Sequence, residues 1–358
     1  MGIFYIIFSI VIFFMQLTVG AWFMRSFPQI GWKIPFFAAL VLTGITYIGL
    51  AYTQTHYNGI FASALYYFAY IWFGLVFLAF CFCAAFAVLC QILTWCHVPT
   101  GWMGTASLLT LVIVFAMAFW GGFSSPKVKH IAVQIPGAPR MKLALLADTH
   151  LGMGVSLARF DKALQKIKAE NPDALLVLGD IFEYGPNSDS YAARLAQVKT
   201  PLGSYGVLGN HEYYVGYGDS KEFFRKASVT LLENEATRMS NGVQVAGLKD
   251  IKTAGVSTQD VAHLLDGLDP KAPTILLSHT PLYAETAAAH GANLMLSGHT
   301  HNGQLWPFNY LVKLQFPRVY GLYDVEGMPF YVTSGVFYWG MPLRFLAPAE
   351  LVILEVNA

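Results

Sequence analysis

The first 125 residues contain no aspartate or glutamate and only two basic residues, Arg25 and Lys33. All 21 acidic residues, and 20 of the 22 lysines and arginines, lie after Ser125. A surface that faces water carries charged side chains, whereas a surface that faces lipid excludes them. The segregation of charge therefore predicts a membrane domain at residues 1–125 and a water-exposed domain at residues 126–358.

The membrane domain contains four apolar runs, at residues 3–24, 34–52, 66–93 and 104–120. Each has about the length of the ~20-residue helix that crosses a bilayer, so we predict an all-α bundle of four transmembrane helices. The first run lacks a basic start and a clear small-residue cleavage site, which indicates a retained anchor rather than a signal peptide. None of the runs has an aspartate, glutamate, lysine, arginine or histidine in its interior. This absence argues against a transporter and favours an anchor.

The distribution of basic residues predicts the orientation of this bundle. Four spans place both ends of the membrane domain on one side of the bilayer. Four basic residues follow the last run: Lys127, Lys129, Arg140 and Lys142. Only Arg25 and Lys33 fall on the opposite side. By the positive-inside rule we expect a multi-pass protein of the inner cell membrane whose second domain faces the cytoplasm.

The second domain alternates strand-like and helix-like segments. "KLALLADTH" and "DALLVLGD" are apolar runs that end on aspartate, and "ARFDKALQKIKAE" between them has helical spacing. Further short apolar runs follow, among them "TILLSH", "NLMLSGH" and "ELVILEV". This order is typical of βαβ units and predicts an α/β fold with mostly parallel sheets.

Polar side chains follow these strands at the point where each ends. In chain order the motifs are "DTH", "GD", "GNHE", "SH" and "GHTH". They place Asp148, Asp180, Asn210, His279 and His299 at the carboxyl ends of strands, where α/β sheets form their sites. The extended spacing in "DTH" and "HTH" also puts His150 beside Asp148 and His301 beside His299.

This set of side chains fits a site for two divalent metal ions. The carboxylate of Asp180 can give one oxygen to each of two cations. Oxygen and nitrogen ligands without thiolate suit manganese, iron, zinc or magnesium. His211 then remains as a general acid or phosphate donor, with Glu212 as a partner that orients its ring.

The motif series resembles the calcineurin-like metallophosphoesterase family over nearly all of residues 140–358. "GHTHNGQLWPF" and the tail "GVFYWGMPLRFLAPAELVILEV" resemble its membrane-attached branch, the transmembrane proteins with a metallophosphoesterase domain. The resemblance implies a four-layer αββα metallophosphoesterase sandwich in which His211 is the catalytic histidine. It implies that one metal is held by Asp148, His150, Asp180 and His301. It implies that the other is held by Asp180, Asn210, His279 and His299. Many members have a second aspartate where this chain has Glu183, which we interpret as a supporting residue and not as a ligand.

These features predict a membrane-anchored, metal-dependent phosphoric ester hydrolase that cleaves a phosphoester or pyrophosphate bond. Two alternatives stay open: a non-catalytic metal-binding membrane receptor or scaffold, and a phosphodiesterase that acts on a soluble nucleotide. The second domain balances 20 basic against 21 acidic residues, so we expect no nucleic-acid partner. The sequence leaves the metals, the substrate and the oligomeric state open.

The segment after the last histidine motif, "LWPFNYLVKLQFPRVYGLY", mixes aromatic, aliphatic and basic residues. Such a mixture suits the headgroup level of a membrane, although it also suits an ordinary core segment. We therefore expect membrane lipids as partners and a lipid or lipid-linked substrate. The resemblance makes a UDP-diacylglucosamine-type molecule one candidate.

Overall fold

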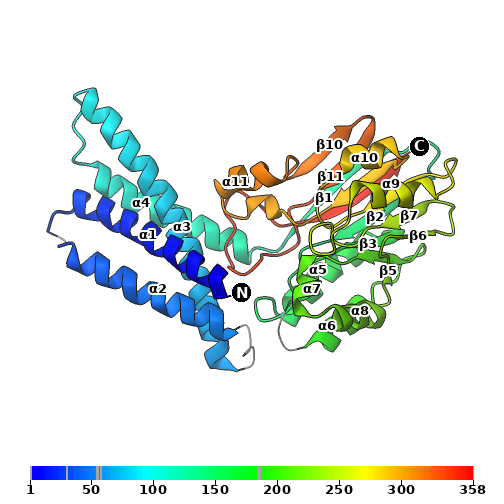
Figure 1. Ribbon diagram of the computed structural model, residues 1–358, viewed down its shortest axis with the longest axis horizontal. Coiled ribbons are helices and arrows are strands. Elements are labelled where there is room, and N and C mark those ends of the chain that lie inside the picture. The colour runs from blue at the N-terminus through cyan, green and yellow to red at the C-terminus, as the bar shows by residue number, and fades with distance from the viewer. Residues whose placement is uncertain (1, 30, 54–55, 57–58, 184–186, 358) are drawn as a thin grey trace. The chain divides into compact units, whose positions relative to one another are not determined.

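The computed structural model describes residues 2–29, 31–53, 56, 59–183 and 187–357 (Figure 1). The chain forms two compact units. The helical unit comprises Met1–Phe123 and Gly340–Phe345, and the α/β unit comprises Ser124–Trp339 and Leu346–Ala358. The division at residue 125 stays a prediction, but the short segment Gly340–Phe345, which we expected in the second domain, packs with the helices.

Four long helices form the first unit, as predicted. They are α1 (Gly2–Ser26), α2 (Lys33–Thr53), α3 (Ile60–Trp95) and α4 (Met103–Phe123). Each is long and apolar enough to cross a membrane. Large apolar side chains point outward from them, for example Val112 and Trp120 on α4. Such a surface is suited to lipid and not to water.

Small and weakly polar residues let these helices approach one another. Gly49 on α2 lies against the backbone of Leu65 on α3, so a larger residue would push the two helices apart. Trp22 on α1 donates its indole N–H to the hydroxyl of Ser107 on α4 at 2.8 Å. Close packing around glycine and interhelical hydrogen bonds are the usual means of holding helices together in lipid.

Two six-stranded sheets form the core of the α/β unit. The first sheet has the order β1 (Lys127–Gln134), β12 (Glu350–Asn357), β2 (Met141–Leu146), β3 (Ala174–Leu178), β4 (Ser204–Val207) and β5 (Thr230–Leu231). The second has the order β10 (Gly321–Val325), β11 (Met328–Val332), β9 (Leu294–Ser297), β8 (Thr274–Leu277), β7 (Gln244–Gly247) and β6 (Glu235–Arg238). Strands β2 to β5 run parallel, as do β7, β8, β9 and β11.

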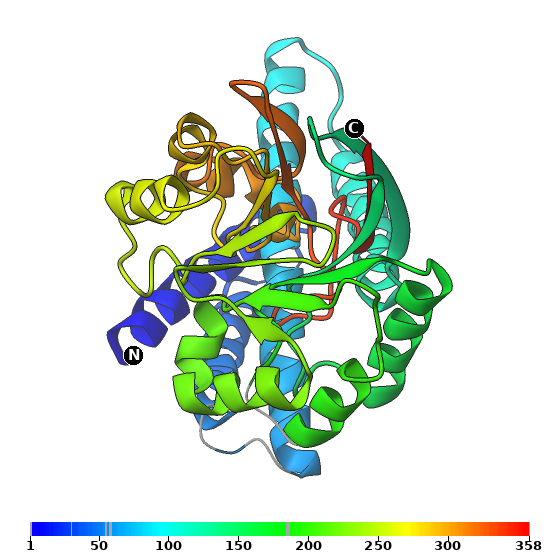
Figure 2. The same cartoon turned by 90° about the vertical axis from the view of Figure 1, so that its right-hand side faces the viewer.

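Helices cover the outer face of each sheet. The first sheet packs on α5 (Leu157–Ala169), α6 (Ser188–Leu195) and α8 (Tyr217–Lys226), and the second packs on α9 (Thr258–Asp266) and α10 (Ala284–Ala289). A third apolar core joins the two sheets face to face. Figure 1 shows the green and the yellow helices on opposite sides of the paired sheets, and Figure 2 shows the same layers from the side. The predicted four-layer αββα architecture is thus confirmed.

The amphipathic pattern of α5 illustrates how sequence selects this packing. Phe160, Leu164 and Ile167 recur at helical spacing and are buried against the first sheet. Burial of each such side chain contributes about 1.5–3 kcal/mol. Ser156 caps the helix by accepting the backbone N–H of Arg159 at 3.3 Å, which ends the preceding loop where the apolar pattern begins.

Candidate metal centre

Five parallel strands from the two sheets bring the predicted ligands together. In the first sheet, β2 is followed by Asp148, β3 by Asp180, and β4 by Asn210 at the start of α7 (Asn210–Val215). In the second sheet, β8 is followed by His279, and β9 by His299. His301 begins the short helix η1 (His301–Gly303). The residues that the sequence placed at strand ends therefore lie close together, in the two clusters of side chains described next.

The backbone at these ligands is unusual. Asp148, His150, Asp180, His299 and His301 all have left-handed φ angles, between 42° and 74°. Residues other than glycine avoid this region, and its cost is of the order of 1–3 kcal/mol each. Strain repeated at five predicted ligands indicates that the fold holds these side chains for a function.

The first cluster contains Asp148, His150 and His301. Their ligand atoms all lie within 4.8 Å of one another. The Nε2 atoms of His150 and His301 are 2.9 Å apart, and Nε2 of His301 is 3.6 Å from Oδ1 of Asp148. All three side chains are buried, so they form a compact set of nitrogen and oxygen donors.

The second cluster contains Asp180, His279 and His299. Nε2 of His279 is 3.1 Å from Oδ2 of Asp180 and 3.1 Å from Nδ1 of His299. The other ring nitrogen of His279 donates to the carbonyl of Leu178 at 2.8 Å, which fixes the ring and leaves Nε2 facing the cluster. Burial and the nearby His279 lower the pKa of His299 to about 3, so its ring is neutral and fit to act as a ligand.

Asp180, a member of the second cluster, also reaches toward the first cluster. Its Oδ2 atom is 3.1 Å from His279 and 4.0 Å from Nε2 of His150, while Oδ1 accepts the backbone N–H of His211 at 2.9 Å. Within the described residues, Oδ2 of Asp148 and Oδ1 of Asn210 are buried without a hydrogen-bond partner. Buried oxygen atoms of this kind need a partner, and a cation satisfies them. The donor set therefore fits two divalent metal ions, one for each cluster.

His211 lies beside the clusters and is oriented by Glu183. Oε1 of Glu183 is 2.7 Å from Nδ1 of His211 and 2.7 Å from Nδ1 of His150. Burial opposes the charge of Glu183, but His211 and His150 outweigh it and lower the pKa of this carboxyl to about 2. Burial likewise opposes the charge of His211, yet Glu183 and Asp180 raise its pKa to about 9. Nε2 of His211 is 4.0 Å from Oδ2 of Asp180, so this ring presents a proton donor to the site.

Glu212 does not orient the ring of His211, contrary to our expectation. Its two carboxylate oxygens accept the backbone N–H groups of Gly209, Asp180, Ile181 and Phe182 at 2.7–3.2 Å. Glu212 is fully buried, and burial followed by the charge of Asp180 raises its pKa to about 7. Glu212 therefore fixes the backbone turn at Asp180, and Glu183 orients the ring of His211 instead.

Two aromatic residues that the sequence motifs did not single out also contact the site. The rings of Tyr214 and Trp339 lie 5.3 and 5.8 Å from the ring of His211. The backbone of Trp339 is fixed by Gln304, which accepts its N–H at 2.8 Å and donates to its carbonyl at 3.0 Å. Tyr214 lies three residues after His211, whereas Trp339 is far away in sequence and lies within the tail motif, where nothing indicated a contact with His211.

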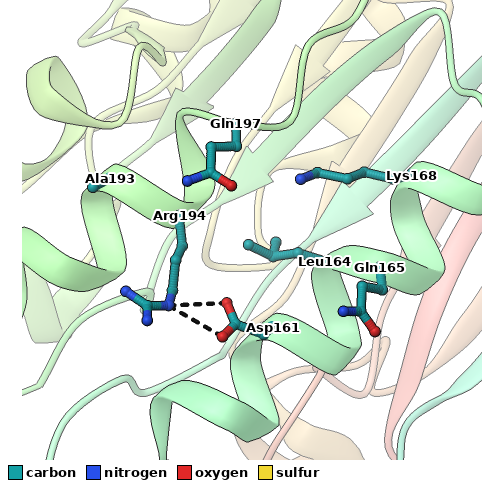
Figure 3. A pocket seen from close by; sticks show the side chains of 7 residues that line it. All are labelled: Asp161, Leu164, Gln165, Lys168, Ala193, Arg194 and Gln197. Atoms are coloured by element: carbon teal, nitrogen blue, oxygen red, sulfur yellow. Dashed lines mark hydrogen bonds and ion pairs between the residues drawn. The ribbon is translucent and has the colours of Figure 1, made fainter.

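A separate hollow of about 380 Å³ lies on the outer helices α5 and α6 (Figure 3). Arg194 and Asp161 form an ion pair at its wall, with 3.0 Å between Nε and Oδ1. Its lining contains none of the predicted metal ligands. The hollow is therefore unrelated to the metal centre.

Comparison with known proteins identifies the family. Residues 141–303 match the calcineurin-like phosphoesterase family. An uncharacterized metallophosphoesterase of Campylobacter jejuni is 34% identical over 256 residues, which make up 70% of this chain and 68% of that protein. The chain belongs to the metallophosphoesterase family. The family resemblance deduced from the sequence motifs is thereby confirmed.

Two further comparisons concern a membrane protein and a solved structure. A transmembrane protein with metallophosphoesterase domain from Bos taurus is 32% identical over 276 residues, 70% of this chain and 62% of that protein. Together with the four apolar helices, this similarity indicates membrane association. Among solved structures, the NAD nucleotidase of Haemophilus influenzae aligns with a TM-score of 0.40 and 15% identity over 56% of this chain and 46% of that chain.

Proposed function

We propose that this metallophosphoesterase hydrolyses a phosphoester or pyrophosphate bond with the help of two divalent metal ions. The observation that carries the proposal is the position of Asp180, whose Oδ2 atom lies within 3.1 Å of His279 and 4.0 Å of His150. One carboxylate thus reaches both clusters, as a two-metal site requires. Asp148, His150 and His301 would complete one site with Asp180, and Asn210, His279 and His299 would complete the other.

We assign a different role in this reaction to each group of residues at the site. Bound divalent ions would stabilise the charge of a phosphate and make hydroxide available near neutral pH. His211 faces the site through Nε2 while Glu183 stabilises the protonated ring through Nδ1. We assign His211 as the proton donor to the leaving oxygen, because a positioned imidazolium is an effective general acid. Tyr214 and Trp339 limit the rotation of this ring by packing against it.

The direct test is purification in detergent, metal analysis, and a screen of lipid and soluble phosphoesters. We expect two metal equivalents and turnover that is lost with chelator and restored by manganese, iron, zinc or magnesium. Metal binding without turnover on any phosphoester would instead support the receptor or scaffold alternative. Turnover restricted to soluble nucleotides would support the phosphodiesterase alternative.

We also propose that the substrate is a lipid or lipid-linked phosphoester, such as a UDP-diacylglucosamine-type pyrophosphate. The support is the apolar surroundings of the acid: Tyr214 and Trp339 are 56% and 44% exposed while they contact His211. The test compares long-chain and short-chain versions of one phosphoester in the wild type and in the double variant Trp306→Ala/Phe308→Ala. Equal rates on both chain lengths, unaffected by the double variant, would contradict a lipid substrate.

The proposed location is the inner cell membrane, with the catalytic domain in the cytoplasm. The support is the excess of basic residues that follow α4, as given by the positive-inside rule. A reporter fused after Ala358 should be active in the cytoplasm, and activity on the opposite side would contradict this orientation.

A further inference from the structure

The exposed apolar side chains of the α/β unit concentrate beside the metal centre. Within the described part of this unit, ten large apolar side chains are exposed: Tyr214, Tyr217, Trp306, Phe308, Tyr310, Leu311, Leu314, Leu322, Trp339 and Leu346. Five of them fall within residues 306–314, directly after the loop that carries His299 and His301. Single exposed apolar residues need no explanation, but such a cluster marks an interaction surface.

Most of this cluster belongs to one short helix, α11 (Phe308–Gln315). No residue of α11 is buried, and Tyr310, Leu311 and Leu314 are 61%, 56% and 85% exposed. Lys313 is exposed on the same helix. A helix that leaves its aliphatic residues outside the core contributes little to the fold, so another role must account for this composition.

The structure fixes α11 to the metal-binding loop. The amide of Phe308 donates to the carbonyl of Leu305 at 2.8 Å, which joins the start of the helix to that loop. Gly303 has a φ of 72° and lies directly against the backbone of Asn309, where a side chain would collide. Movement of α11 is therefore transmitted to the loop that holds His301.

The charges around α11 decide which kind of partner fits it. Arg318 is bound by Glu285, with 2.6 Å between Nη2 and Oε1, so it does not supply a cation to the surface of the helix. Lys313 does supply one, and the described residues of α11 include no acidic side chain. An aromatic, aliphatic and singly basic surface matches the boundary between lipid headgroups and acyl chains. The four helices α1 to α4 are long and apolar enough to cross a membrane, and as spans they would hold the chain at the bilayer.

We infer that α11 is an interfacial helix, which lies along the membrane surface with Tyr310, Leu311 and Leu314 in the lipid. The partner is the bilayer itself. The link from α11 to the metal-binding loop then places the metal centre where a lipid phosphate can enter it, and this last step rests on the proposed function. The location of α11 does not depend on catalysis, so the two are tested separately.

The location is tested by fluorescence quenching in the full chain. All four native cysteines, Cys81, Cys83, Cys90 and Cys96, are first replaced by alanine. A single new cysteine, Leu314→Cys, is labelled with the environment-sensitive dye NBD in nanodiscs of phosphatidylcholine and phosphatidylglycerol. Leu322→Cys on β10 is the matched control, because this leucine is 48% exposed but lies outside α11. We expect spin-labelled lipid to quench the dye at position 314 and not at 322, and dissolved iodide to quench in the reverse order.

Each other outcome contradicts the inference. Equal quenching by lipid at both positions would remove α11 from the membrane. Protection from iodide without quenching by lipid, in a particle of twice the expected mass, would show that a second copy covers the helix. The same protection without a change in mass would show that α11 packs against its own chain.

The consequence for catalysis is tested with Leu314→Asp and the control Leu322→Asp. We expect Leu314→Asp to raise KM for a long-chain phosphoester by on the order of tenfold, the effect of one lost apolar contact in binding, with kcat on bis(p-nitrophenyl) phosphate unchanged. An unchanged KM would contradict the inference. A protein that is quenched by lipid at position 314 but hydrolyses no phosphoester would disprove the proposed function and leave the location of α11 intact.

Discussion

At the level of single residues, the metal centre depends most on Asp180. Its Oδ2 atom lies 3.1 Å from Nε2 of His279 and 4.0 Å from Nε2 of His150, so replacement by alanine removes the ligand that we propose for both metals. We predict that Asp180→Ala abolishes hydrolysis and lowers the bound metal below two equivalents. The measurements are turnover and metal content of the purified variant. Near-normal turnover would contradict a two-metal assignment.

His211 should behave differently, because we assign it to proton donation and not to metal binding. We predict that His211→Ala lowers kcat by on the order of 10²–10⁴ while both metals stay bound. Glu183→Gln should lower kcat by about 10–100-fold, since it weakens the orientation and charge of the same ring without removing it. Metal content and kcat are measured together for both variants. The loss of one metal equivalent in His211→Ala would make this residue a ligand.

The sequence predicts the positions of some site residues but not the contacts of every side chain. The strand-end positions of Asp148 and His299 were predictable, because an apolar run that stops at a polar residue indicates the carboxyl end of a strand. The role of Glu212 was not predictable, since adjacency to His211 in the sequence says nothing about where a side chain turns. Its carboxylate turns to the backbone at Gly209 and Asp180, while the more distant Glu183 reaches the imidazole.

At the level of elements, α11 and the residue that follows it show the same limit. The mixed composition of residues 305–323 left a membrane surface and a core segment as equal possibilities. The structure divides the segment: Leu314 is 85% exposed, whereas Phe316 is buried and packs against His299. Burial depends on neighbours from other strands, which a local pattern cannot contain.

Strands β11 and β12 contribute a second feature that the sequence did not reveal, a buried carboxylate at Glu350. It accepts hydrogen bonds from the hydroxyls of Tyr331, Tyr320 and Thr333 at 2.7–2.9 Å. The backbone N–H of Glu350 also donates to the carbonyl of Gly335 at 3.0 Å, and Gly335 packs directly against Asp148. The network therefore fixes the loop that supports a predicted metal ligand.

We predict that Glu350→Ala weakens metal binding without touching any ligand. Loss of the carboxylate leaves several buried hydroxyls unsatisfied and loosens the loop behind Asp148. The affinity for one metal equivalent should fall by about tenfold, as for other residues that act behind a ligand. Calorimetric metal titration measures the effect, with Glu355→Ala on the exposed side of β12 as the control. Equal affinities in the two variants would mean that the network serves stability alone.

At the level of the whole molecule, the division of charge in the sequence correctly indicated apolar helices followed by an α/β unit. It did not indicate that Gly340–Phe345 belongs with the helices. The segment contains a charged residue, Arg344, and follows a loop of the α/β unit, so composition assigned it to that unit. In the structure Arg344 is 2% exposed, and its backbone N–H donates to the carbonyl of Ala118 on α4 at 2.9 Å.

The packing of Gly340–Phe345 depends on Gly121 and Gly122 near the end of α4, because a side chain on either glycine would collide with the backbone of this segment. A side chain on Gly122 would collide with the carbonyl of Pro342, so Gly122→Ala must displace the segment, at a cost of about 1–3 kcal/mol for an overpacked site. Gly44→Ala on α2 is the matched control, because no atom of the residues that the structure describes lies within 4 Å of the added group. We expect trypsin to cleave after Arg344 much faster in Gly122→Ala than in the wild type, with Gly44→Ala unchanged. If Arg344 is equally protected in both variants, the segment is held by contacts other than those at α4, and the helical unit ends at Phe123.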